Sequence, residues 1–209
     1  MDLDPLALIG FVLLGGLYML AISRGESIAV RRRVKSARGW SIGDMPDGVL
    51  GRITGRVRPL GEPLRAPLTN RACVCFVAEV ASDFVPGTYR EVHAIPFVIE
   101  DDTGTAIIDP AGAAFDVPLA TTGACGRAIA TPAEAEMFAR RGHGPTLRLE
   151  DWTFREGVIE AGATVAVLGT GDREPDPSAP MDGAGVYRAM PTRLRLVAKR
   201  GYPLAISRR

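Results

Sequence analysis

The chain has 209 residues, of which 25 are basic and 24 acidic, and the part after residue 38 carries 19 basic and 21 acidic side chains. That small acidic excess argues against a nucleic-acid-binding module, which normally shows a clear basic excess. The three cysteines and two histidines show no CxxC or HxxxH spacing, so the sequence predicts no metal site and no cofactor.

The first element is an uncharged run of 19 residues, PLALIGFVLLGGLYMLAIS, over residues 5–23. As a helix it would be about 28 Å long, close to the hydrocarbon thickness of a bilayer. A buried helix of a soluble protein would be shorter or show a polar face. A cleaved signal peptide would begin with basic residues, whereas Asp2 and Asp4 stand here. We therefore predict a retained transmembrane anchor over residues 1–23.

A basic segment follows the anchor, and we assign residues 24–46 to a juxtamembrane linker with a short helix up to Arg38. The positive-inside rule places this side of the membrane in the cytoplasm and the amino terminus outside. The residues expected to set this topology and to contact anionic lipid headgroups are Arg31, Arg32, Arg33 and Lys35. A nucleic-acid-binding arm is the alternative interpretation of these charges.

The sequence pattern over residues 47–209 predicts one mainly β domain. A strand is expected around 49–57, with Gly51 and Gly55 as bend points. A proline-rich loop and then a strand over 71–82 follow. In that strand Cys73 and Cys75 would share one face, and Phe76 would lie on the other. Both are interpreted as reduced core cysteines.

The next segment, around residues 83–91, is predicted to be a loop that contains Tyr89. A hairpin is expected over 97–108, with a turn in which Gly104 can take a positive φ. One good helix begins at Pro132, with Thr131 as its N-cap, Glu134 completing a capping box and Gly142 at its end.

Two strands joined by the EAGA segment, a flexible loop over 171–185 and two terminal strands complete the chain. The predicted fold class is mainly β with one helix. It would be an OB-like or related small barrel or sandwich, preceded by one transmembrane helix.

The order of these pieces resembles the GIDE-type domain, also called Beside-A-Membrane, of membrane-anchored ubiquitin ligases and their bacterial relatives that lack a RING. The segments EPLRAPLTNRACV and EGVIEAGATVAVLG carry most of the resemblance, and the DDTG hairpin is a weaker mark. The resemblance extends over the whole chain. In the ligases a second membrane helix and a zinc-binding RING follow the domain.

The resemblance implies a membrane-anchored domain at the cytoplasmic face that acts as a membrane sensor or scaffold. Its partner would be the membrane together with a protein, a peptide or a lipid headgroup. Five cysteine and histidine residues in all are too few for a RING, which needs about eight ligands. We expect no catalytic residue, because neither His93 nor His143 lies near a nucleophile motif. The alternatives are a ligase-family enzyme and an OB-like nucleic-acid binder.

Overall fold

The computed structural model describes residues 27–82, 88–123, 132–139, 152–176, 192–199, 201 and 204–209. In this part the chain is mainly β and contains two short helices, one over residues 27–36 and α2, Pro132–Ala139. The chain forms two compact units. The barrel unit comprises Val30–Glu62, Ile95–Asp116 and Ala161–Arg209, and the sheet unit comprises the other residues.

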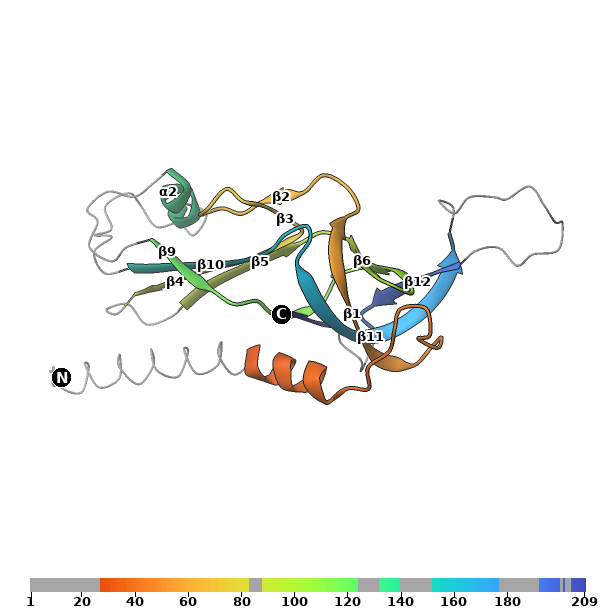
Figure 1. Ribbon diagram of the computed structural model, residues 1–209. Helices are drawn as coiled ribbons and strands as arrows, with labels where there is room; N and C mark the ends of the chain where they lie inside the picture. The colour runs from red at the N-terminus through yellow and green to blue at the C-terminus, as the bar shows by residue number, and fades with distance from the viewer. Residues whose placement is uncertain are drawn as a thin grey trace, which may run out of the picture. The chain divides into compact units, whose positions relative to one another are not determined.

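A closed barrel of five strands forms the centre of the barrel unit (Figure 1). The strand order is β1-β6-β7-β12-β11, and β11 pairs back with β1. Only β7 and β12 run parallel; the other pairs in the barrel are antiparallel. The barrel strands are β1 (Leu50–Pro59), β6 (Phe97–Asp101), β7 (Gly104–Ile108), β11 (Thr164–Pro175) and β12 (Thr192–Val197).

Two more strands, β13 (Ala205–Arg208) and β8 (Ala114–Asp116), extend this sheet beyond β11. The barrel core follows the two-residue period of a strand. On β1, Ile53 and Val57 are buried, and on β12 Leu194 and Leu196 are buried. The first half of β11 is different, because consecutive residues from 165 to 168 are all buried. An element outside the barrel must therefore cover its outer face.

The hairpin predicted over 97–108 is confirmed as β6 and β7. The carboxylate of Asp101 accepts hydrogen bonds from the backbone N–H groups of Thr103 at 2.8 Å, Gly104 at 3.0 Å and Ile42 at 2.9 Å. Burial raises the pKa of Asp101, but these bonds and that from the Thr103 hydroxyl outweigh burial and lower it. Gly104 does not have the positive φ that we expected. The turn is stabilised by the aspartate side chain instead.

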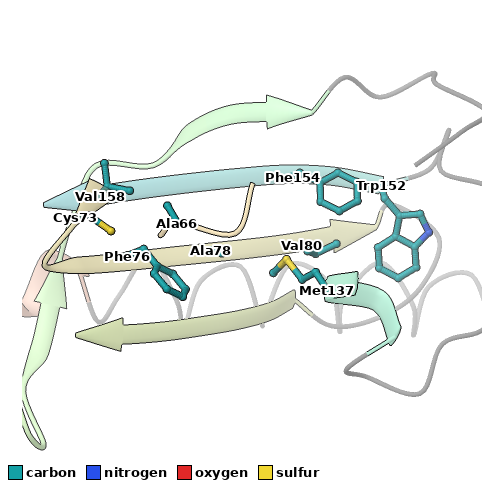
Figure 2. Close-up of a cluster of buried hydrophobic side chains, with 9 residues drawn as sticks. All are labelled: Ala66, Cys73, Phe76, Ala78, Val80, Met137, Trp152, Phe154 and Val158. Atoms are coloured by element: carbon teal, nitrogen blue, oxygen red, sulfur yellow. The ribbon is translucent and has the colours of Figure 1, made fainter. Parts of the chain in front are cut away.

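The sheet unit contains a four-stranded sheet in the order β5-β4-β10-β9. Its strands are β4 (Cys75–Ser82), β5 (Thr88–Ala94), β9 (Ala120–Gly123) and β10 (Trp152–Ile159). Helix α2 and a ribbon of two short strands, β2 (Leu64–Arg65) and β3 (Ala72–Cys73), belong to the same unit. Figure 2 shows the cluster that joins them: Met137 of α2 packs with Val80, Trp152 and Phe154 of the sheet, and Ala66 lies next to the ribbon.

The single strand expected over 71–82 is interrupted at Val74, which separates β3 from β4. The N–H of Val74 donates to the carbonyl of Ile159 at 2.8 Å. Because of this break, Cys73 packs in the cluster that contains Phe76 and Ala78 (Figure 2). The prediction that Cys73 lies on the face opposite to Phe76 is therefore wrong. Both cysteines are nevertheless free and buried, as expected.

Two predicted loops are partly strand. Residues 88–91, assigned to a loop, form the first half of β5, where Tyr89 lies opposite Val80. Residues 171–175, also assigned to a loop, continue β11 and pair with β12. In both places a cross-strand partner fixes a segment whose own sequence has no strong strand pattern. Helix α2 begins at Pro132 as predicted, while Thr131 and Gly142 lie outside the described residues.

From Val30 onward, the segment assigned to the juxtamembrane linker packs on the barrel. Val30, Val34, Ile42 and Met45 are each less than 5% exposed. The anchor predicted over residues 1–23 lies outside the described residues. Within the described residues, no helix has the length and apolar character needed to cross a bilayer.

Candidate functional site

The helix over residues 27–36 covers the outer face of β11. Val30 and Val34 stand four residues apart, so they lie on one side of the helix. They pack with Ala166 and Leu168 of β11 and with Ala205 of β13. This contact explains why β11 is buried on both faces. We call residues 27–38 the basic helix segment.

An ion pair joins this segment to the barrel. The guanidinium of Arg31 donates two hydrogen bonds to the carboxylate of Asp116, from Nε at 2.9 Å and from Nη2 at 3.0 Å. The Asp116 side chain is 3% exposed and also accepts a bond from the Ser207 hydroxyl at 2.8 Å. The hydrogen bonds and charge of Asp116 raise the pKa of Arg31. Arg31, which we predicted to contact headgroups, is therefore used to position the helix.

The carboxyl end of the helix is fixed by β1. Arg52 donates to the carbonyls of Val34 at 3.3 Å and Lys35 at 3.4 Å, where a cation also complements the helix dipole. The backbone of Arg52 bonds to that of Arg38 and Trp40 at 2.8 Å each. The Arg38 guanidinium lies over the Trp40 ring, 4.1 Å from its centroid. The segment is therefore attached to the barrel at both its start and its end.

The remaining predicted site residues are exposed. Arg32, Arg33 and Lys35 are exposed on the helix, whereas Val30 and Val34 are buried. Their side chains have no ion-pair partner among the described residues. By contrast, the barrel cations Arg193, Arg195 and Lys199 each pair with an acidic residue. The helix thus presents three exposed charges for which the described part of the chain supplies no ion-pair partner.

The net positive charge of the barrel unit comes from this segment. The ranges of the unit contain sixteen basic and twelve acidic residues in the sequence. Residues 30–38 supply five of the basic residues and none of the acidic ones, which leaves eleven basic and twelve acidic residues in the rest of the unit. An anionic partner would therefore be attracted to the basic helix segment rather than to the barrel strands.

We expect Arg31→Gln to lower the free energy of unfolding of the barrel unit by about 1–2 kcal/mol, because buried Asp116 would lose two charge-assisted hydrogen bonds. The value is below that for a fully buried pair because Arg31 is itself half-exposed. Arg33→Gln is the matched control and should change stability by less than about 0.5 kcal/mol. Denaturant unfolding of the full chain in detergent measures both, and equal effects would contradict the assigned role of Arg31.

No group of three or more candidate metal ligands occurs among the residues that the structure describes. Cys73 and Cys75 are buried free thiols. Burial raises the pKa of Cys73 to about 11, and burial also raises that of Cys75. Both are therefore protonated thiols at neutral pH and poor nucleophiles. Cys125 and His143 lie outside the described residues.

A thiol-labelling experiment tests this assignment. In a Cys125→Ser background, neither Cys73 nor Cys75 should react with a maleimide at pH 7 in the folded chain, and both should react in denaturant. An added Leu60→Cys, at a side chain 51% exposed, is the positive control and should label at once. Rapid labelling of Cys73 or Cys75 in the folded chain would show that these thiols are accessible.

A carboxylate in the sheet unit was not predicted from the sequence. Glu156 is 4% exposed and accepts hydrogen bonds from the N–H groups of Leu68 at 2.7 Å and Thr69 at 3.1 Å, and from the Thr69 hydroxyl. These bonds hold the turn between β2 and β3. On the other side of the sheet, buried Glu79 pairs with Arg90 at 3.0 Å. Both carboxylates have structural partners.

His93 lies on β5 and stacks on Phe76, with ring centroids 5.1 Å apart. Its Nε2 is 2.9 Å from one carboxylate oxygen of Glu91, and the other carboxylate oxygen accepts a hydrogen bond from the Tyr89 hydroxyl at 3.0 Å. A comparison with protein-family models, curated proteins and solved structures finds no match to this chain.

Proposed function

We propose that the chain is a membrane-anchored, non-enzymatic domain whose barrel unit lies close to the cytoplasmic face and whose basic helix segment contacts anionic lipid headgroups. The observation that carries the proposal is a helix docked on the barrel by Val30, Val34 and Arg31, with Arg32, Arg33 and Lys35 exposed. The uncharged run ends at Ser23, only four residues before this helix. Because four residues span at most about 14 Å, the proposed anchor would end within that distance of the helix.

Basic residues next to a membrane span contribute about 1 kcal/mol each to the attraction of an anionic surface. On a flexible linker such charges would hold the barrel only loosely. Here the helix is packed on the barrel and bonded to it at both ends. Headgroup contact would therefore also fix the orientation of the barrel, as suits a membrane sensor or scaffold that presents a surface to a protein or peptide.

The strand order of the barrel supports an OB-like assignment. Numbered along the chain, the five strands are arranged first, second, third, fifth, fourth, with the third and fifth parallel. By family name the resemblance suggests a ubiquitin ligase. With five cysteine and histidine residues, the purified chain should form no ubiquitin chains with any conjugating enzyme.

An OB-like barrel also raises nucleic-acid binding as a second candidate function. Barrels of this kind that bind single strands combine a basic groove with exposed aromatic side chains. Outside residues 30–38 the barrel unit has one more acidic than basic residue. We therefore favour the lipid surface. Retention of the full chain in detergent on an immobilised single-stranded oligonucleotide at 150 mM salt would favour the alternative.

The lipid proposal is tested with the full chain in nanodiscs, carrying a fluorophore at Ser36→Cys, an exposed position on the helix. Quenching by spin-labelled headgroups should increase when phosphatidylglycerol is added to phosphatidylcholine. Arg32→Glu combined with Arg33→Glu should abolish the increase. The matched control makes the same charge change at the exposed Arg56 and Arg58 of β1 and should preserve it. Quenching that does not respond to phosphatidylglycerol would refute headgroup contact.

A further inference from the structure

Strand β5 is an edge of the four-stranded sheet. All seven of its residues pair with β4 in one continuous register, from Thr88 opposite Ala81 to Ala94 opposite Cys75. In the described part of the chain no strand pairs with its other side. An edge of this kind exposes a row of backbone donors and acceptors that can pair with another chain.

The other strand edges of the described chain are protected. The five barrel strands close on themselves, the edge strand β8 that extends their sheet has only three residues, and β2 and β3 of the ribbon have two each. At the opposite side of the four-stranded sheet, β9 has only four residues, and its pairing with β10 is interrupted by a register shift. Short and irregular edges resist pairing, whereas β5 has no proline, no lysine and no bulge.

The side chains of β5 restrict how two copies of it could pair. Tyr89, Glu91 and His93 lie on one face, and Arg90 and Val92 lie on the other. If a twofold axis perpendicular to the sheet relates the two copies, residues on the same face of the two strands stand opposite each other. One residue must then lie at the axis, opposite its own copy. Centring on Arg90 or Glu91 would place like charges opposite each other, which is unfavourable.

Centring on Val92 is complementary. It places Val92 opposite its copy, and Glu91 of each strand opposite His93 of the other. Val92 is 39% exposed and is one of five large hydrophobic side chains exposed in the described chain. The charge of Arg90 is compensated within its own sheet by Glu79. This register therefore gives an apolar contact at the axis and, on each side of it, a carboxylate–imidazole contact in addition to the one that His93 and Glu91 make within each strand.

We propose that two copies of this chain pair through β5 in an antiparallel arrangement about Val92, joining their two four-stranded sheets into one. About five residues of each strand would take part, which is a small interface for a soluble dimer. The inference rests on the proposed membrane attachment, because confinement to one membrane raises the effective concentration of the second copy.

The test uses the full chain in native membranes, with Cys125→Ser and Val92→Cys. Directly opposite residues of antiparallel strands have Cα atoms about 4.5–5.5 Å apart, within disulfide range. Mild oxidation should link Val92→Cys into dimers at least about fivefold more than Leu60→Cys, an exposed control on the barrel unit. Equal linking at the two positions would overturn the proposal.

A charge exchange tests the register. His93→Glu would place a carboxylate opposite Glu91 and should reduce linking several-fold, whereas His93→Glu with Glu91→Lys should restore it. A double variant that fails to restore linking while keeping the wild-type circular dichroism would contradict the register. Protection from hydrogen exchange, in a monomeric chain, of the β5 amides that point away from β4 would show pairing of this edge within one chain, and would also contradict the proposal. Loss of headgroup quenching with preserved cross-linking would contradict the proposed function but not the pairing through β5.

Discussion

Gly55→Ala is expected to lower the free energy of unfolding of the barrel unit by about 3 kcal/mol. Gly55 lies on β1 where it pairs with β11 and approaches β6. A Cβ at this position would stand 2.7 Å from the carbonyl oxygen of Glu100 and 3.1 Å from its backbone carbon and nitrogen. All three contacts are with backbone, so no side chain can move aside. The strands would have to separate where the barrel closes, and overpacking of this kind costs about 1–3 kcal/mol or more.

Gly61→Ala is the matched control. It makes the same chemical change in the same unit, but a Cβ there meets nothing within 4 Å and its φ is not positive. We expect a change within about 0.5 kcal/mol. Urea unfolding followed by circular dichroism measures both variants. Equal stability of the two variants would show that β1 and β6 do not approach as closely as described.

Glu156→Ala should destabilise the sheet unit by about 3 kcal/mol. The carboxylate is the acceptor for two backbone N–H groups and one hydroxyl in residues 68–69. Bonds to a charged acceptor contribute about 1.5–3 kcal/mol each, and buried donors left without a partner are costly. The turn between β2 and β3 should loosen, because those bonds attach it to β10. Hydrogen exchange at Leu68 and Thr69 should rise together with the loss of stability.

Glu160→Ala provides the control for this effect. Glu160 pairs with Arg71, and both side chains are at least one-third exposed. Ion pairs of this kind contribute about 0–1 kcal/mol. A difference of about 2 kcal/mol or more between the two variants is expected. If Glu160→Ala is as destabilising as Glu156→Ala, burial of the carboxylate is not what makes Glu156 important.

Local sequence signals predicted the elements that depend on neighbouring residues. The β6–β7 hairpin follows from two apolar runs around a turn, and α2 begins at Pro132 because a proline suits the first helical position. The sequence did not predict the elements whose conformation depends on a partner distant in the sequence. Residues 88–91 and 171–175 became strand through pairing with β4 and β12, which their own sequences do not reveal.

The candidate site was predicted in composition but not in geometry. The charges of Arg31, Arg32, Arg33 and Lys35 are plain in the sequence. The partner of Arg31 is Asp116, 85 positions away, and no local pattern connects them. Two signals for the docked helix were present: Val30, Val34 and Ala37 have helical spacing, and the ATVAVLG run of β11 is apolar on both faces. Together they indicate a helix that covers an otherwise exposed strand face.

Both proposals depend on anchoring of the chain with its barrel at the cytoplasmic face. A reporter pair fused after Arg209, one active only in the cytoplasm and one only outside it, tests this topology. The proposal predicts activity of the cytoplasmic reporter alone, from a chain that stays with the membranes after a carbonate wash. Activity of the external reporter, or release of the intact chain by the wash, would contradict it.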